Sequence, residues 1–322
     1  MTPAQLSRTV RHAVCRAVAD GVLDVAVPDD VRVERPGPGG CGDWATGVAL
    51  RLAGPAGQPP RVVAERLRER IADRPGVAGV EITGPGFLNI TLGGDPAERL
   101  REITEAAARQ ARRAREARRE TPVERGGRAV VWSGTVELLR RIEGYGTESG
   151  TPPVADHEDT ADALGTDATR WAFLSAAAHD PARPGPRLLR QHESNPLFTV
   201  RYAHARAHAL SRNAAALGFT AAVEPYGTGA GEEKNAARGV ERWVADWPAA
   251  IGSAARLHAP DRIARHLEGT ADALLGFQPA VLPVGGAKPL AAHRSRLALA
   301  EAAGAVLAGG LTLLGISAPD HL

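Results

Sequence analysis

Beyond residue 160, the apolar residues of this chain recur at helical spacing almost to its end. Five stretches show the pattern, each separated from the next by a break rich in Pro and Gly: residues 161–178, 196–217, 232–246, 259–278 and 291–308. Amphipathic helices joined in this way bury their apolar faces against one another. The second half of the chain is therefore predicted to be an all-α bundle.

The first 95 residues mix two kinds of pattern. Apolar residues at intervals of four predict a helix over residues 4–20, and residues 43–53 and 59–73 are also helical in pattern. The alternation at residues 31–36 predicts a strand, and residues 77–92 fit two strands joined by a Gly-Pro-Gly turn. The predicted fold class is therefore α+β, with a small N-terminal α+β domain joined to a C-terminal all-α bundle.

The segment between these two parts has the composition of a connector. Residues 94–120 are crowded with Ala, Arg and Glu, which is typical of a long exposed helix stabilised by pairs at four-residue spacing. Residues 121–160 alternate one short apolar stretch, residues 129–132, with segments rich in Gly, Ser, Thr and Pro. We expect residues 96–158 to form a connecting helix and a linker, which is either unrelated sequence or the remnant of a further domain.

Composition limits the partners of this chain. Its 322 residues carry a formal net charge of only +2, which argues against a strongly basic nucleic-acid binder. Lys234 and Lys288 are its only lysines, so almost every basic residue is an arginine. Arginine binds phosphate and stacks on bases, but a GC-rich coding bias would produce the same composition. Cys15 and Cys41 show neither metal-site spacing nor a disulfide framework, and no uninterrupted apolar run approaches about 18 residues. These features predict a cytoplasmic protein without a membrane partner.

Five motifs resemble the arginyl-tRNA synthetase family. Residues 42–50 (Gly-Asp-Trp-Ala-Thr-Gly-Val-Ala-Leu) and 84–90 (Gly-Pro-Gly-Phe-Leu-Asn-Ile) resemble its N-terminal tRNA-binding domain. Residues 164–173, 195–206 and 309–322 resemble its DALR-type anticodon-binding domain, through Arg-aromatic, Tyr-Ala-His-Ala-Arg and Leu-Leu-Gly-Ile-Ser-Ala-Pro elements. Each motif is weak alone, but together they are specific to this family.

The resemblance also implies a missing part. The family places a class I catalytic domain between its two RNA-binding domains, whereas here only residues 93–160 lie between the two sets of motifs. The implied domains are residues 1–95 and 159–322, in a truncated form of the synthetase. The His-x-Gly-His motif and the lysine-rich loop with which class I synthetases stabilise ATP phosphates are absent from the sequence. No catalytic residue, no cofactor and no ligase activity are therefore expected.

Two histidines at helical spacing raise the question of a metal site. His204 and His208 stand four residues apart, as the metal-binding histidines of zinc hydrolases do. Ala205, however, occupies the position where such a hydrolase carries its Glu, and no third ligand is suggested nearby. No metal site is predicted.

Phe87 and Asn89 give the sharpest hypothesis about a site. The resemblance implies that they face the tRNA elbow, where the aromatic ring packs against a splayed D-loop base and the Asn reads the edge of that base. Unstacked bases held by aromatic faces and side-chain hydrogen bonds are the usual source of RNA specificity. From the residues alone, the alternative stays open that Phe87 lies in the core and that Asn89 satisfies a turn.

The resemblance implies a second RNA-binding surface around residues 201–206. The family's Tyr-Ala-His-Ala-Arg helix exposes residues toward the anticodon loop. Arg201 stands where the family usually has Gln, and this change would either add a phosphate contact or alter base preference. The chain ends in Leu, where the family often has Met. The residues that the resemblance assigns to the anticodon are Arg201, Tyr202, His204, Arg206 and Leu322.

Together, these observations predict a non-catalytic, arginyl-tRNA synthetase-like protein that binds the elbow and anticodon regions of tRNA, with arginine tRNA as its partner and no DNA partner. A protein-interaction module or regulator of a genuine synthetase or tRNA-dependent enzyme is the alternative. The near-neutral charge favours it, and so does Phe277-Gln278, where the family has Phe-Tyr. A subunit that supplies tRNA to a separate catalytic chain is a third possibility.

Overall fold

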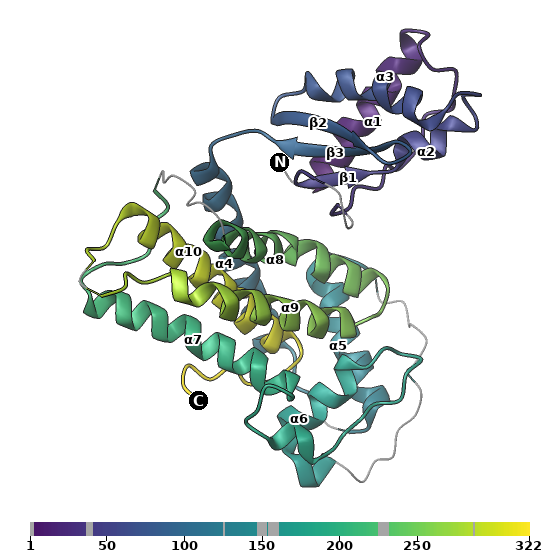
Figure 1. Ribbon diagram of the computed structural model, residues 1–322. Coiled ribbons are helices and arrows are strands. Elements are labelled where there is room, and N and C mark those ends of the chain that lie inside the picture. The colour runs from purple at the N-terminus through teal and green to yellow at the C-terminus, as the bar shows by residue number, and fades with distance from the viewer. Residues whose placement is uncertain are drawn as a thin grey trace. The chain divides into compact units, whose positions relative to one another are not determined.

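The computed structural model describes residues 3–36, 41–124, 126–146, 153, 161–224, 232–285 and 287–322. The chain divides into two compact units, Met1–Arg99 and Leu100–Leu322 (Figure 1). The first unit contains a three-stranded sheet, and the second consists of helices and loops over its described residues. The predicted α+β fold class, with a small mixed domain and a helical bundle, is confirmed.

The N-terminal unit packs helices against its antiparallel sheet, whose strand order is β1-β3-β2. Helix α1 packs on α3, and α3 packs on β2. Leu6, Val10 and Val14 of α1 and Leu67 and Ile71 of α3 are fully buried between these elements. The elements of this unit are α1 (Pro3–Ala19), β1 (Trp44–Thr46), α2 (Val48–Ala53), α3 (Pro60–Ala72), β2 (Val77–Thr83) and β3 (Phe87–Leu92).

The sheet differs from the sequence prediction at one edge. Residues 44–46 were expected to begin a helix, but they form β1, which pairs with β3 through Trp44↔Ile90 and Thr46↔Leu88. The predicted strand at residues 31–36 forms only a single bridge, between Glu34 and Ala45. The helix begins later than expected because Gly47 stands at the N-cap of α2 and separates β1 from the helix that follows.

The helical unit is a bundle in which α8 packs on α9, and α7 packs on both α9 and α10. Its largest fully buried side chains include Trp132, Trp171 and Trp247, which come from three different helices. The α-helices of this unit are α4 (Pro96–Glu120), α5 (Arg128–Glu143), α6 (Ala161–Ser175), α7 (Pro196–Ala216), α8 (Glu232–Arg256), α9 (Asp261–Phe277) and α10 (Ala291–Leu313), with short 3-10 turns η2 (Pro186–Leu189) and η3 (Gln278–Ala280).

Helices α4 and α5 differ from the expected connector. From Leu100 onward, α4 belongs to the helical unit, and Ala107, Ala111 and Ala114 bury a narrow stripe of that helix. Gly309 of α10 lies so close that an added Cβ would stand 3.2 Å from the Cα of Ala111. Small side chains on both helices permit this approach, and a stripe of alanines is a weak hydrophobic signal in an arginine-rich sequence.

The predicted linker also contains a core helix. Helix α5 buries Trp132, Leu138 and Leu139 in the main hydrophobic cluster, so residues 128–143 are part of the bundle. The rest of the predicted linker is only partly described, because residues 125, 147–152 and 154–160 lie outside the described residues. The domain boundaries at residues 96–158 and 159–322 therefore stay a prediction. The structure itself divides the chain into two units after Arg99.

Two arginines from other helices satisfy the C-terminal end of α10. Arg118 donates to the carbonyl oxygens of Thr312 and Leu313, and the Arg170 Nε donates to the Leu314 carbonyl at 2.7 Å. The last carbonyls of a helix lack partners within the helix, and positive charge is favourable there. Burial lowers the pKa of Arg170 to about 10, and the charge of Arg118 contributes in the same direction.

Helix α10 also has the length and composition of a membrane-spanning helix, although no uninterrupted apolar run in it approaches about 18 residues. Among the helices of the described residues it is the only one of this kind. However, 67% of its most apolar window is buried inside the protein, and a core helix of a soluble protein passes the same test.

Candidate nucleic-acid interfaces

A hollow of about 780 Å³ opens on the N-terminal unit. The turn between β2 and β3 forms one of its walls, and this turn requires glycine. Gly86 has φ +146° and lies so close to α3 that an added Cβ would stand 2.9 Å from the Pro60 carbonyl oxygen, while Gly84 has φ +54°. L-amino acids with a Cβ rarely adopt such angles. This turn places Phe87 at the first position of β3, beside the hollow.

Phe87 is not a core residue, because 42% of it is exposed. Its ring lies against Gly47, where an added Cβ would stand 3.5 Å from the ring edge. Asn89, by contrast, is 2% exposed, and its Nδ2 donates a hydrogen bond to Thr83 Oγ1 at 2.6 Å. Both residues line the hollow, but only Phe87 presents a large free surface to it. The reading of Phe87 as core is therefore wrong, while Asn89 does satisfy the hairpin locally.

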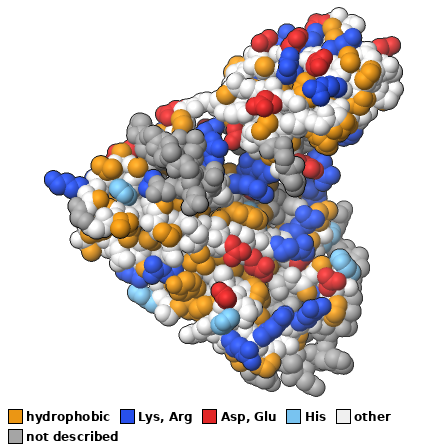
Figure 2. Space-filling model, viewed as in Figure 1, with side chains coloured by type: hydrophobic (Ala, Val, Ile, Leu, Met, Phe, Trp, Pro, Cys, Tyr) orange, Lys and Arg blue, Asp and Glu red, His pale blue; other side chains and the backbone are white. Residues whose placement is uncertain are grey.

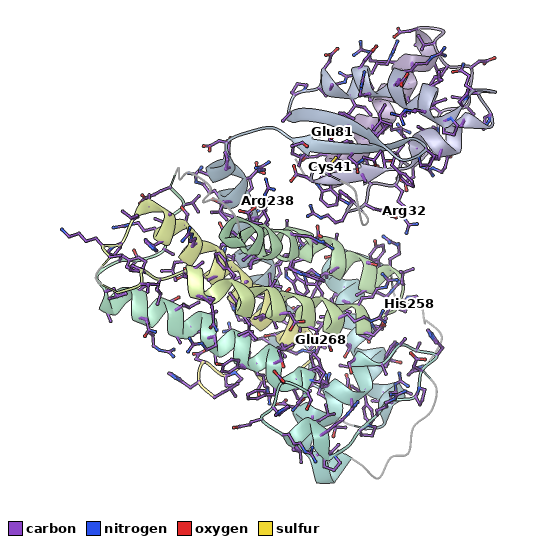
Figure 3. The ribbon with its side chains drawn as sticks, in the orientation of Figure 1. Arg32, Cys41, Glu81, Arg238, His258 and Glu268 are labelled. Carbon is purple, nitrogen blue, oxygen red and sulfur yellow. The ribbon has the colours of Figure 1, made fainter. Side chains whose placement is uncertain are left out.

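Three arginines that the sequence motifs did not single out surround this hollow: Arg32, Arg35 and Arg51. Arg32, labelled in Figure 3, has an 81% exposed side chain and pairs with Glu34 at 2.6 Å. The guanidinium of Arg35 lies 3.8 Å above the centre of the Trp44 ring. An exposed aromatic ring in a hollow that is also lined by guanidinium groups can stack one base and attract the adjoining phosphates. No spacing rule brings residues 32, 51 and 87 together, so sequence reasoning missed this arrangement.

In the helical unit, α7 carries most of the residues that the resemblance assigned to the anticodon. Pro196 begins the helix, and the Asn195 Nδ2 before it donates to the carbonyls of Leu188 and Arg190, both at 2.8 Å. Tyr202 is 38% exposed, and its ring stacks on that of Phe198 with centroids 5.7 Å apart. These two rings form the aromatic part of the α7 surface.

Arg201 and Arg206 make contacts within the protein. Arg201 forms an ion pair with Asp167 of α6 and donates from Nε to the Ser317 carbonyl at 3.1 Å. The Arg206 Nε donates to Gln278 Oε1 at 2.9 Å. The glutamine that replaces the family's usual tyrosine therefore binds this arginine. Both side chains connect neighbouring elements to α7, so both guanidinium groups already have partners within the protein.

His204 and Leu322 differ in exposure. His204 is buried to 2% exposure, and its Nδ1 lies 3.0 Å from the Pro319 carbonyl oxygen. Burial lowers the pKa of His204. Leu322, at the end of the same tail, is 56% exposed. The structure thus brings α7 and the C-terminal tail together, and it also places Asp320 beside His204 and His208, a third donor that local sequence did not suggest.

Comparisons with known proteins agree with both units. Residues 4–92 match the family model of the arginyl tRNA synthetase N terminal domain, and residues 200–322 match that of the DALR anticodon binding domain. The arginine–tRNA ligase of Frankia alni is 57% identical over 95 residues, which cover 30% of this chain and 17% of that protein. The arginine–tRNA ligase of Pseudarthrobacter chlorophenolicus is 35% identical over 176 residues, covering 52% of this chain and 31% of that protein.

The fold agrees as well. The solved structure of Thermus thermophilus arginyl-tRNA synthetase superposes with a TM-score of 0.58 at 13% identity, over 100% of this chain and 100% of that one. The chain spans less than a third of the length of the curated relatives named above. The chain therefore combines the N-terminal domain of arginyl-tRNA synthetases with a DALR anticodon binding domain, and in both it resembles the arginyl-tRNA synthetase family.

Proposed function

We propose that this protein is a non-catalytic, cytoplasmic tRNA-binding member of the family that holds the elbow of arginine tRNA with its N-terminal unit. The observation that carries the proposal is the exposed Phe87 ring beside a hollow that is lined by Arg32, Arg35 and Arg51. An aromatic face held at a rigid strand end is a platform for an unstacked base, and one such stack contributes about 1–3 kcal/mol. Asn89 supports the hairpin that presents the ring.

We further propose that the helical unit contacts the anticodon arm through α7 and the C-terminal tail. Tyr202 offers an exposed ring, and Phe198 supports it from the preceding turn of the helix. Leu322 extends from the tail beyond His204. In this proposal Arg201, His204 and Arg206 hold the surface in shape, while Tyr202 and Leu322 touch RNA.

Absence of ligase chemistry is the third part of the proposal. Helices α4 and α5 lie in the sequence between the two family matches, together with α6, and bury their apolar faces in the bundle. The ATP-binding motifs of class I synthetases are absent from the sequence. As a pseudoenzyme, the purified chain should not support arginine-dependent exchange of pyrophosphate into ATP. Exchange clearly above that of a tag-only preparation contradicts this part.

Filter binding of arginine tRNA and total tRNA at several salt concentrations tests the RNA part. Phe87→Ala should weaken binding about 5- to 150-fold, which corresponds to the loss of one stack. Leu290→Ala is the control, because Leu290 is an exposed apolar residue that belongs neither to the lining of the hollow nor to α7 or the C-terminal tail. Equal affinities for Phe87→Ala and the wild-type protein would exclude the hollow as a base-binding site.

The second candidate function, a docking module for a synthetase or tRNA-dependent enzyme, rests on charge. The net charge is +2, and Arg201 and Arg206 are engaged within the protein. Figure 2 shows Lys and Arg side chains interspersed with acidic and apolar side chains over the coloured part of its face. If the wild-type protein fails to bind tRNA at low salt while a synthetase co-purifies with it, this second function replaces the first.

A further inference from the structure

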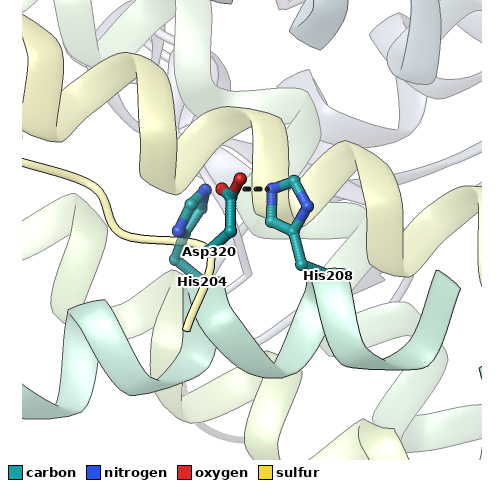
Figure 4. A group of neighbouring side chains, drawn as sticks. All are labelled: His204, His208 and Asp320. Carbon is teal, nitrogen blue, oxygen red and sulfur yellow. Dashed lines mark ion pairs between the residues drawn. The ribbon is translucent and has the colours of Figure 1, made fainter. Parts of the chain in front are cut away.

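A cluster of three metal-binding side chains joins α7 to the C-terminal tail. His204 and His208 are one helical turn apart and project from the same side of α7, and the tail places the Asp320 carboxylate between them (Figure 4). One donor atom from each residue lies within 4.8 Å of the other two. It is the one such group of histidine, cysteine and acidic side chains within the described ranges.

The hydrogen bond that His204 makes leaves its Nε2 available to bind a metal ion. The His204 Nδ1 lies 3.0 Å from the Pro319 carbonyl oxygen, so this nitrogen carries the proton and donates it. The Nε2 of the same ring is then a free acceptor. A histidine that donates its other ring N–H to a backbone carbonyl is the usual arrangement of a metal ligand, because that bond fixes both the tautomer and the direction of the ring.

We propose that His204 Nε2, His208 Nε2 and the Asp320 carboxylate bind one Zn²⁺, with water in a fourth position. Zinc with nitrogen and oxygen ligands at about 2.0–2.1 Å in a tetrahedron requires ligand atoms about 3.4 Å apart. The His208 Nε2 and the Asp320 Oδ1 already lie 3.4 Å apart. The other donor atoms lie within 4.8 Å of one another, and the His208 and Asp320 side chains are exposed, which leaves both room to rotate toward His204. Two imidazoles and one carboxylate suit Zn²⁺ rather than the harder Mg²⁺ or Ca²⁺.

The bound ion would fasten the end of the chain. Ile316 is buried, Ser317 is bonded to Arg201 and Asp167, and the Pro319 carbonyl accepts a hydrogen bond from His204, so the tail is held as far as residue 319. A metal at Asp320 extends this attachment by one residue and strengthens it, to within two residues of Leu322. This inference does not depend on RNA binding.

Titration of the metal-free full chain with Zn²⁺, monitored by calorimetry, tests the site. One equivalent should bind, and His208→Ala and Asp320→Asn should each weaken that binding at least about 100-fold, because loss of a partner that only orients a ligand already costs about 10–100-fold. His321→Ala and His179→Ala are matched controls, since both histidines lie outside the cluster. Both controls should retain the wild-type affinity.

Cobalt substitution separates this site from adventitious binding to the free thiols of Cys15 and Cys41. Co²⁺ at the cluster should give a tetrahedral visible spectrum without a thiolate charge-transfer band, and His208→Ala should abolish it. Zn²⁺ should also raise the melting temperature of the wild-type protein and of His321→Ala, but not of Asp320→Asn. Unchanged Zn²⁺ affinity in His208→Ala and Asp320→Asn, or a thiolate band in the cobalt spectrum, overturns the proposal.

Discussion

Backbone carbonyl oxygens replace the water around one guanidinium group inside this protein. Arg128 is 1% exposed and donates to the carbonyls of Phe173, Ala176, Ala177 and Asp180, which lie at and beyond the end of α6. Carbonyls at a helix end need such donors, and arginine offers five N–H groups in a fixed geometry. The arginine content of this chain therefore does not measure its affinity for RNA, since part of that content stabilises the fold.

Arg170 provides a test of this role. Its guanidinium binds the carbonyls of Leu314 and Glu124 and the hydroxyl of Thr135. Arg170→Leu leaves these acceptors without this donor and should lower the free energy of unfolding by at least about 3 kcal/mol, because each buried acceptor left unsatisfied costs about 1–3 kcal/mol. Urea unfolding measures the change. Arg190→Ala, at an exposed position, is the control and should change stability by less than about 0.5 kcal/mol.

His266 predicts how stability depends on pH. Burial lowers the pKa of His266 from 6.5 to about 4, against the opposing effects of its bond to the Trp243 carbonyl and of Asp246. In the unfolded state, His266 binds a proton near its ordinary pKa of 6.5, whereas in the folded state it does not bind one until the pH is near 4. Stability therefore falls as the pH drops from about 6.5 to about 4. The loss approaches about 3 kcal/mol at the lower end.

Urea unfolding at neutral pH and near pH 5 measures this loss, with His266→Gln as the variant. The glutamine should reduce the difference between the two pH values, and His179→Ala, at an exposed histidine, should leave it unchanged. His204 has a lowered pKa as well, so part of the pH dependence should remain in His266→Gln. An identical pH dependence in His266→Gln and the wild-type protein contradicts the assignment.

At the scale of elements, the close packing of α10 rests on glycines. An alanine Cβ at Gly304 would lie 2.8 Å from the Cβ of Ala207 on α7, and both positions are buried. Neither Cβ can move without its helix. Gly304→Ala should therefore destabilise the protein by about 1–3 kcal/mol, the usual cost of overpacking. Gly276→Ala is the matched control on α9, because nothing lies within 4 Å of its added Cβ.

The control should act in the opposite direction. Alanine is a better helix former than glycine by about 0.8–1 kcal/mol, so Gly276→Ala should leave stability unchanged or raise it. Chemical denaturation of the two variants under the same conditions compares them directly. If both variants raise stability equally, α7 and α10 are not in close contact at this position.

Sequence patterns predicted those elements whose burial is periodic. Leu6, Val10 and Val14 mark α1 clearly, and all three are buried. The patterns failed where a neighbour supplies the reason for burial. The local sequence around Ala111 indicates an exposed helix, and only the packing of Gly309 against Ala111 explains why it is buried. Strand β1 is too short to show an alternation of apolar and polar residues. Both depend on contacts with residues far away in the sequence.

For the whole molecule, the family motifs pointed to the two proposed surfaces, but they did not indicate which distant side chains lie beside the motif residues. The resemblance identified Phe87, and its exposure agrees with a surface role. It could not indicate that Arg32 and Arg51 line the same hollow, or that Asp320 meets His208, because each pair is joined only by tertiary structure. Nor could it indicate that Arg201 is paired with Asp167.

The last prediction concerns which segments fold as independent units. A fragment of residues 96–322 contains α4 and α5, and it should unfold cooperatively, as should a fragment of residues 1–95. A fragment of residues 159–322 lacks both helices. It loses the burial that Leu138 and Leu139 provide, and Arg170 loses its acceptors at Glu124 and Thr135.

We therefore expect residues 159–322 to aggregate or to unfold without a cooperative transition, as proteins do when specific core packing is lost. Circular dichroism melts and the dispersion of amide NMR signals distinguish the three fragments. Fragment 96–322 serves as the positive control, since it differs from the shorter fragment only by residues 96–158. A cooperative melt of fragment 159–322 at the temperature of fragment 96–322 would mean that α4 and α5 are a dispensable connector, because a bundle that needs their apolar faces cannot keep its stability without them.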